Sequence, residues 1–484
     1  MALHVVSARA LALEMTRTTR HRSDMKRPAA PPALPAVPSP RQGIGRFAAG
    51  LVAIALAIAI VPAVSAAEAW QSYIERHALA LELRPEAAAL DQVLEATTDA
   101  RLLLLGEATH GTREYYEWRA AISRRLIENE ALSFIAVEGD WIAIHRLNRY
   151  VKGYPESGDS AAEVLRQHDR WPEWMWANLV IVELAEWLRS WNDDRIEDER
   201  VGIYGVDVYG WGDSVVDLPQ WLDDLEDGWG GRVAAATQAL RATQGDNQRF
   251  FQALGAQHDL GLAELEATRA RLSSKRDAWR DRDRKAYLQA KQQTSLILQA
   301  ASHLTKTATR NPRSWNPRAE NFYATAARLL DHYGADSRGV LWAHNTHVGD
   351  ARHTPMAPHG LRTVGQDARE HLGEEETFII GFASARGSLR AAVQWGAPGR
   401  AMDLPEAPQD TLDGLLAQAG HDALWLPLEP ARGQPELERH LGHRAIGVVH
   451  DPRRPVRQQF VPSNIPMRYD AILFIDATNA LGSL

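Results

Sequence analysis

Short apolar runs without polar alternation are the feature that most constrains the fold of this chain. "RLLLLG" at 101–106 and "FIAVEGD" at 134–140 are hydrophobic at consecutive positions, which is typical of strands buried on both faces. Further runs of this kind occupy 201–207, 339–345, 377–383, 445–451 and 471–477. Because helical patterns fill the intervals, the sequence predicts an α/β fold with an open, largely parallel sheet flanked by helices.

One interval differs from the others in composition. Residues from about 212 to 336 contain no comparable apolar run and are rich in Ala, Leu, Gln, Arg and Asp. The stretch "AELEATRARLSSKRDAWRDRDRKAY" within it has the spacing of long amphipathic helices. We therefore expect a helical cap or hairpin region beside the sheet, inside a single catalytic domain that spans 67–484.

The amino-terminal part of the sequence predicts export. Residues 47–64, "FAAGLVAIALAIAIVPAV", form an apolar run that follows Arg41 and Arg46 and precedes the small residues of "VSAAEA". This order is typical of a secretory signal peptide, here cleaved after Ala66, although an apolar run of this length also fits an uncleaved membrane anchor. We expect residues 1–66, with their Pro- and Ala-rich lead, to lie outside the fold. The mature protein is then periplasmic or secreted, or anchored to the inner membrane if cleavage does not occur.

Composition and motif content exclude several classes of partner and several kinds of active site. The net charge is −8 and Lys and Arg form no dense block, so nucleic acid is not expected as a partner. The absence of cysteine excludes disulfides, zinc–thiolate centres and a cysteine nucleophile. The sequence has no G-x-S-x-G elbow, no P-loop, no G-x-G-x-x-G after a strand and no H-E-x-x-H, which argues against a serine hydrolase of the α/β-hydrolase type, the common nucleotide sites and a zincin.

Polar side chains follow the ends of four predicted strands. In chain order they are Glu107 and His110, Glu138 and Asp140, Asp207, and His344 with His347. Because the ligand crevice of an open α/β sheet lies beyond the carboxyl ends of its strands, we expect these side chains to converge. Arg119 lies on the helix predicted after Thr112, on the same stripe as Tyr115 and Trp118. Its side chain either lies at the edge of the core or reaches back to the crevice as an anion clamp.

Two kinds of chemistry fit this set of residues. A neutral histidine oriented by a carboxylate takes a proton from water, while a further charged group stabilises the oxyanion. The alternative is a divalent Zn, Mn or Fe ion that activates the water, bound by Glu107, His110, Glu138, His344 and His347. The spacings fall in loops and specify no metal, so we favour catalysis without metal or cofactor. Asp140 and Asp207 are equally well explained as helix N-caps.

Several segments together resemble the erythromycin esterase-like family. They are "GEATHGTREYYEWRAAISRRLI", "VEGDW", "WPEWMWANLVIVELAEWLRSWN", "VGIYGVDVYG", "WNPRAENF", "LWAHNTHVGD" and "RYDAILFIDAT". They occur in order from about residue 70 to the C-terminus, and the G-E-x-x-H-G-T and A-H-N-x-H motifs are specific to the family. The resemblance implies hydrolysis of an ester by water, as in members that open the lactone of macrolides without a serine nucleophile and without a metal.

The resemblance also implies roles for individual residues. The family's general base matches His110. Glu107, Arg119 and Glu138 match its supporting charged residues, and His344 and His347 match the histidines of the second motif. Asp207 and Trp174 lie in matching segments, but no chemistry is assigned to them. Macrolide-inactivating members act in the cytoplasm, whereas this chain carries an export signal, so the fold and the water-based hydrolysis transfer better than the substrate does.

We therefore expect an exported hydrolase that cleaves the ester or lactone of a small molecule through water activated by His110. The alternative from another class is a non-catalytic binding protein related to envelope polysaccharides, which holds a polar ligand with the same residues. The combination of Glu107, His110, Glu138 and His344 favours the enzyme, because a binding site has no need of a base.

Overall fold

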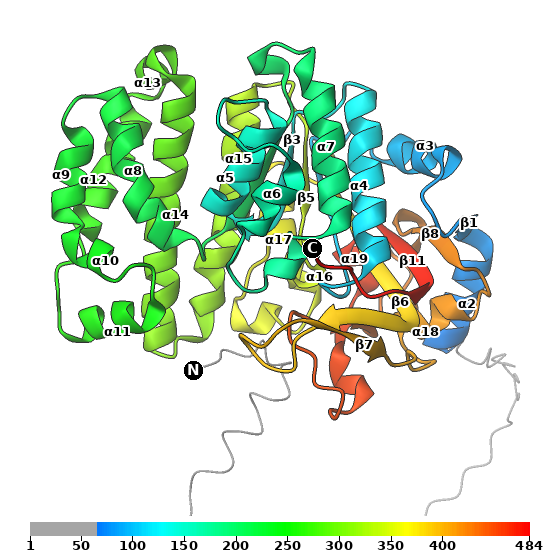
Figure 1. Cartoon of the computed structure of the whole chain (residues 1–484). Coiled ribbons are helices and arrows are strands. Elements are labelled where there is room, and N and C mark those ends of the chain that lie inside the picture. The colour runs from blue at the N-terminus through cyan, green and yellow to red at the C-terminus, as the bar shows by residue number, and fades with distance from the viewer. Residues whose placement is uncertain (1–64) are drawn as a thin grey trace, which may run out of the picture. The chain divides into compact units, whose positions relative to one another are not determined.

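The computed structural model describes residues 65–484, which contain a nine-stranded sheet (Figure 1). The strand order is β1-β8-β11-β6-β2-β5-β3-β4, and β7 pairs with β6. The strands are β1 (Leu79–Leu81), β2 (Leu102–Leu105), β3 (Phe134–Asp140), β4 (Gly202–Asp207), β5 (Gly339–Trp342), β6 (Thr377–Ala391), β7 (Arg400–Leu404), β8 (Ala423–Pro427) and β11 (Ala471–Thr478). A separate hairpin pairs β9 (Leu441–Arg444) with β10 (Phe460–Ser463).

The sheet is open and largely parallel, as predicted. The neighbouring strands from β11 to β4 are all parallel, and β1, β7 and β8 join in antiparallel pairs. The strand expected at 445–451 is wrong. This segment crosses the ends of the strands, where it makes only single bridges from Ile446 to Thr109 and from Val449 to Ala392. A short apolar run does not distinguish a buried strand from a buried crossing segment.

Consecutive residues of β2 enter two hydrophobic cores, one on each face of the sheet. Leu102 and Leu104 belong to one core, and Leu103 and Leu105 belong to the other. Because successive side chains of a strand point to opposite faces, a continuous apolar run is needed to fill both cores. The helices α4 (Arg113–Glu128) and α7 (Leu179–Asp193) cover one face, and α15 (Asn316–Tyr333) and α17 (Val364–His371) cover the other (Figure 1).

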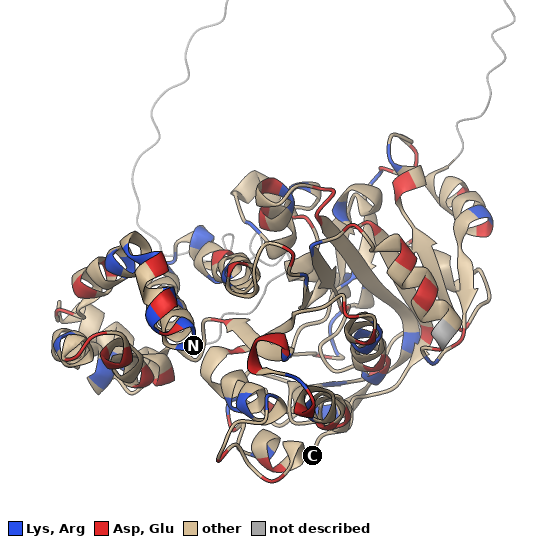
Figure 2. Ribbon diagram, turned by 90° about the horizontal axis from the view of Figure 1, so that it is seen from above, with Lys and Arg blue, Asp and Glu red and all other residues tan. Residues whose placement is uncertain are grey.

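Residues 211–333 form the expected helical region beside the sheet and add no strand to the part of the chain that the structure describes. Its helices are α8 (Trp211–Leu225), α9 (Trp229–Ala236), α10 (Gln238–Ala242), α11 (Asn247–Gly255), α12 (Leu262–Ser274), α13 (Arg276–Arg282), α14 (Arg284–Ala308) and α15. The longest, α14, packs against both α8 and α15. Seen from above, the helices α8 to α14 lie at the left of the molecule, where Lys and Arg positions on the ribbon are intermixed with Asp and Glu positions (Figure 2).

The remaining helices complete the layers and the strand connections. They are α2 (Ala66–His77), α3 (Ala87–Ala96), α5 (Trp141–Val151), α6 (Ala161–Arg166), α16 (Asn345–Val348), α18 (Leu412–Ala417) and α19 (Ile465–Arg468). Ser65 caps α2, because its hydroxyl accepts a hydrogen bond from Glu68 N while the Glu68 carboxylate accepts one from Ser65 N.

The expected leader, residues 1–66, falls outside the described residues except for Ser65 and Ala66. Its cleavage and the extent of the catalytic domain therefore stay predictions. Between residues 65 and 484, no helix has both the length and the hydrophobicity needed to cross a membrane.

Candidate active site

The loop after β2 carries a buried carboxylate–imidazole pair. His110 Nδ1 donates to Glu107 Oε1 at 2.8 Å, and the Glu107 side chain is 1% exposed. Gly106 allows the loop that carries His344 to approach, since a Cβ at this position would lie 2.1 Å from Asn345 Oδ1. His110 Nε2 has no hydrogen-bond partner within residues 65–484. The pair therefore fixes the orientation of the imidazole and leaves one ring nitrogen free.

Arg119 reaches back from α4 to the other oxygen of the same carboxylate. Its Nη2 donates to Glu107 Oε2 at 2.8 Å, and both side chains are buried. The guanidinium also lies 4.4 Å from the ring centre of Tyr116 and 5.1 Å from that of Trp342. Of the two positions expected for Arg119, the structure shows the one in the crevice, where it acts as the counterion of Glu107.

The surroundings shift the pKa values of the pair in opposite directions. Burial alone raises the pKa of Glu107, but Arg119 and the hydrogen bond from His110 outweigh it, so the pKa lies below its ordinary value. Burial alone lowers the pKa of His110, but the carboxylates of Glu138 and Glu107 outweigh it, so the pKa lies above its ordinary value. The site is therefore built to hold a charged carboxylate and to stabilise a protonated imidazole.

A second charged group forms at the end of β3 around Arg318, a residue of the segment "WNPRAENF" for which the sequence predicted no role. Arg318 Nη2 donates to Glu138 Oε1 at 2.8 Å and to Asp207 Oδ2 at 2.7 Å, and its Nε donates to Asp207 Oδ1 at 2.9 Å. The sequence signal that could have identified Arg318 is its place in the first turn of a helix, between the apolar residues Pro317 and Ala319. Asp207 is therefore an ion-pair partner rather than a simple helix cap.

His347 lies in this second group and does not contact the Glu107–His110 pair. Its Nε2 accepts a hydrogen bond from Arg318 Nη1 at 2.9 Å, and its ring stacks between Trp315 and Phe322 with centroid distances of 4.4 and 4.8 Å. Burial and the positive charge of Arg318 lower the pKa of His347 well below its ordinary value. The ring is therefore neutral, and the nitrogen that would accept a proton is already occupied.

His344 lies beside His110, with ring centroids 4.8 Å apart. Its Nε2 donates to the Ala108 carbonyl oxygen at 3.2 Å, and its Nδ1 accepts from Thr346 N at 3.2 Å. Burial and the neighbouring His110 lower its pKa to about 3. The His344 backbone N–H donates to Glu138 Oε2 at 2.9 Å, so this residue links the two charged groups of the site.

Asp140 and Trp174, also singled out in the sequence, lie outside these contacts. Asp140 occupies the N-cap position of α5 but makes no side-chain capping bond. It forms an ion pair with Arg170 instead, and burial, assisted by Asp207 and Asp213, raises its pKa to about 7. Trp174 is buried in a hydrophobic core beside Gly399.

The donor atoms do not fit a metal centre in this arrangement. Glu107, His110 and Glu138 each offer a ligand atom within 4.8 Å of the others, but both oxygens of each carboxylate already accept hydrogen bonds. Arg119 and Arg318 would repel a cation at this distance. The ring nitrogens of His344 are both engaged, and Nε2 of His347 faces Arg318. The absence of a metal requirement remains a prediction that needs a direct test.

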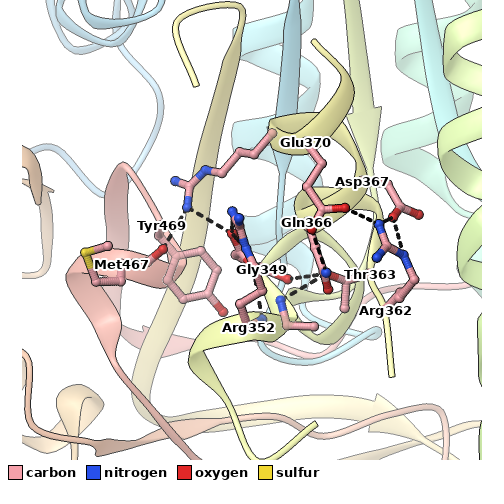
Figure 3. A network of polar contacts seen from close by, with 12 residues as sticks. Gly349, Arg352, Arg362, Thr363, Gln366, Asp367, Glu370, Met467 and Tyr469 are labelled. Carbon is pink, nitrogen blue, oxygen red and sulfur yellow. Dashed lines mark hydrogen bonds and ion pairs between the residues drawn. The ribbon is translucent and has the colours of Figure 1, made fainter. Parts of the chain in front are cut away.

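A polar network anchors the segment that follows the second histidine motif (Figure 3). The Thr363 hydroxyl donates to the Gly349 carbonyl oxygen at 2.8 Å, and Arg362 pairs with Asp367 and Glu370. Arg369 on α17 donates to the Met467 carbonyl oxygen at 2.7 Å. Since these contacts tie the chain after α16 to α17 and α19, they restrict the loop that positions His344 and His347.

Comparison with protein-family models gives one match to a described family. A model described as erythromycin esterase matches residues 127–478. The chain belongs to the erythromycin esterase family. Glu138, Arg318 and the second histidine motif lie inside the matched range, whereas Glu107 and His110 precede it.

Three solved structures resemble this member of the family. A Bacillus cereus protein is 18% identical, with a TM-score of 0.73 over 86% of this chain and 99% of that one. A succinoglycan biosynthesis protein is 17% identical, with a TM-score of 0.68 over 86% and 98%. A histidine-to-asparagine mutant of the erythromycin esterase EreC in its open conformation is 15% identical, with a TM-score of 0.61 over 84% and 98%. At these identities the likeness shows the fold alone.

Proposed function

We propose that this family member hydrolyses a carboxylic ester or lactone of a small molecule with water, and that His110 is the general base. One observation carries the proposal: among the three histidines of the site, His110 alone donates from one ring nitrogen to a carboxylate and leaves the lone pair of the other without a partner in the described chain. The unpartnered Nδ1 of His347 carries the ring hydrogen, because its Nε2 accepts from Arg318. Membership of the family supports ester hydrolysis as the reaction class.

The reaction follows from the positions of the two His110 nitrogens. In the neutral ring Nδ1–H donates to Glu107, so the lone pair of Nε2 is free to take a proton from water. The water oxygen adds to the carbonyl carbon, the C–O bond to the leaving group breaks, and the leaving alkoxide takes the proton from Nε2. Glu107 stabilises the imidazolium formed on the way, and Arg119 keeps Glu107 ionised. The products are a carboxylic acid and an alcohol, joined in one molecule when the substrate is a lactone.

The protonation of His110 limits the activity at low pH. Because the pKa of His110 lies above its ordinary value, the ring is protonated, and cannot act as a base, over a range that extends above about pH 6.5. We therefore expect the acid limb of the pH profile of kcat/KM to lie above that value.

The test is a panel of simple esters, lactones and macrolides, with the products identified by mass spectrometry as the substrate plus one water. A positioned base contributes about 10²–10⁴-fold to rate, so His110→Ala should lose at least about two orders of magnitude in turnover and keep its melting temperature. His359→Ala, at an exposed histidine, is the matched control and should retain full activity. Near wild-type turnover of His110→Ala would refute the assignment. Tight binding of a panel member without turnover by the wild type would instead support the non-catalytic alternative.

We propose in addition that the protein is exported. The apolar run at 47–64 and the small residues after it support this proposal. An exported esterase would meet its substrate in the periplasm or the medium.

A further inference from the structure

A groove lies in the helical region, on a side of α15 that does not face the candidate active site. It has a volume of about 400 Å³ and is enclosed by α12, α14 and α15. This volume is within the range of about 300–1,000 Å³ that is usual for small-molecule sites. Arg318, on the first turn of α15, contacts the active-site carboxylates, whereas Asn321 and Arg328 of the same helix line the groove.

The groove gathers positive charge from each of its three helices. Arg269 on α12, Lys291 on α14 and Arg328 on α15 all line it, and Glu266 is the single carboxylate among the lining residues. Glu266 is already paired with Arg269. The helical region elsewhere mixes both signs of charge (Figure 2), so an excess of cations around a concave surface requires an explanation.

Arg328 has no acidic partner in the described chain. Its Nε donates to Gln292 Oε1 at 2.6 Å and its Nη2 to Thr325 Oγ1 at 3.3 Å, and no carboxylate of residues 65–484 lies within ion-pair distance. Burial lowers its pKa to about 10, which still leaves the guanidinium charged at neutral pH. Within residues 65–484, Lys291 Nζ likewise makes a single hydrogen bond, to the Ser273 hydroxyl, and no ion pair. A partly buried cation without a counterion is costly unless a ligand supplies the negative charge.

Asn321 lines the groove but gives it no accessible acceptor. Asn321 is 0% exposed to solvent, and its Nδ2 donates to the Val206 carbonyl oxygen at 2.7 Å. Its Oδ1 is buried and has no hydrogen-bond partner. Because this oxygen has no accessible surface, a ligand in the groove meets the cationic side chains and not Asn321 Oδ1.

We propose that this groove binds a small anion that carries a phosphate or carboxylate group. Lys291 and Arg328 hold the anionic group, because ammonium and guanidinium groups bind phosphate and carboxylate by charge-assisted hydrogen bonds. The site shares no residue with the proposed catalytic set and does not depend on the proposed hydrolysis.

The test is isothermal titration of the full-length protein with glucose 6-phosphate, with glucuronate and with neutral glucose. We expect one of the two anions to bind at one site per chain and glucose not to bind. Loss of a hydrogen bond to a charged group weakens binding about tenfold or more, so Arg328→Gln and Lys291→Gln should each raise the Kd by that factor. Arg282→Gln, at an exposed arginine of α13 outside the groove, should leave the Kd unchanged.

The outcomes separate phosphate from carboxylate recognition and specific from non-specific binding. Tighter binding of glucose 6-phosphate identifies the phosphate as the recognised group, and tighter binding of glucuronate identifies the carboxylate. If Arg328→Gln does not fold, as judged by thermal unfolding, Lys291→Gln on α14 decides. Absence of binding by both anions, or an equal loss of affinity in Arg282→Gln and the groove variants, would overturn the proposal.

Discussion

Replacement of Glu138 by glutamine isolates the electrostatic role of this carboxylate in the candidate site. The side chain keeps its shape but loses its charge. In the wild type its oxygens accept from Arg318 Nη2 at 2.8 Å and from the His344 backbone N–H at 2.9 Å. The amide has only one acceptor oxygen, so one of these two donors loses its partner.

The expected shift of the His110 pKa follows from the distance between the groups. At a separation of at most 4.8 Å, a carboxylate and an imidazolium attract each other by roughly 3.5 kcal/mol at an effective dielectric constant of about 20. Arg318 lowers the pKa of His110 in the wild type and in the variant alike, so its charge does not enter the difference. An attraction of roughly 3.5 kcal/mol corresponds to about 2.5 pH units.

The sign of the change follows from the protonation state that Glu138 stabilises. Without the carboxylate, the imidazolium of His110 is less stable and its pKa falls. The acid limb of kcat/KM therefore moves to lower pH by about 2.5 units, while turnover at the pH optimum falls because the imidazolium formed in the transition state is also less stable. Glu436→Gln, at an exposed glutamate, is the control and should leave the profile in place.

The assay is the pH dependence of hydrolysis of a confirmed substrate, measured with the melting temperature of each variant. If Glu138→Gln lowers the melting temperature and leaves the acid limb where it is in the wild type, Glu138 has a structural role only. The electrostatic account of His110 would then be wrong.

Three further predictions concern stability, metals and export. Arg318→Met leaves Glu138 and Asp207 buried without their shared cation, so urea denaturation should show a loss of about 3–5 kcal/mol; the exposed Arg439→Met should cost less than about 0.5 kcal/mol, and equal values would contradict the ion-pair account. Activity should survive dialysis against a chelator, whereas loss of activity with recovery on addition of one particular ion would establish a metal enzyme. Expressed with its leader in a bacterium, the protein should be recovered from the periplasm or medium with Ala67 as its first residue, and an intact leader in the cytosol would contradict export.

Local sequence patterns predicted much of the sheet and one half of the site. The runs that form β2 to β6 and β11 are recognisable because strands buried on both faces must be apolar at consecutive positions. Glu107 and His110 are three residues apart in one loop, so their proximity is a short-range property. The stripe of α4 that places Arg119 on the buried side is likewise a matter of helical period.

Only the tertiary structure decided which charged group of the site each histidine of the second motif joins. The A-H-N-x-H motif does not distinguish the two residues. In the structure His344 lies beside His110, whereas His347 stacks between Trp315 and Phe322. His110 follows β2 and His344 follows β5. These two strands are far apart in the sequence but adjacent in the sheet, because β5 lies between β2 and β3.

What the sequence determined by itself is the set of secondary elements and the chemical groups at their ends, since both depend on neighbouring residues. What it could not determine is the partner of each charge. Arg318 lies 180 residues from Glu138 and 111 from Asp207 along the chain, and no local period links residues so far apart. Their contact exists because α15 packs over the ends of β3 and β4, and the cost of burying an unpaired carboxylate then selects the arginine that reaches both.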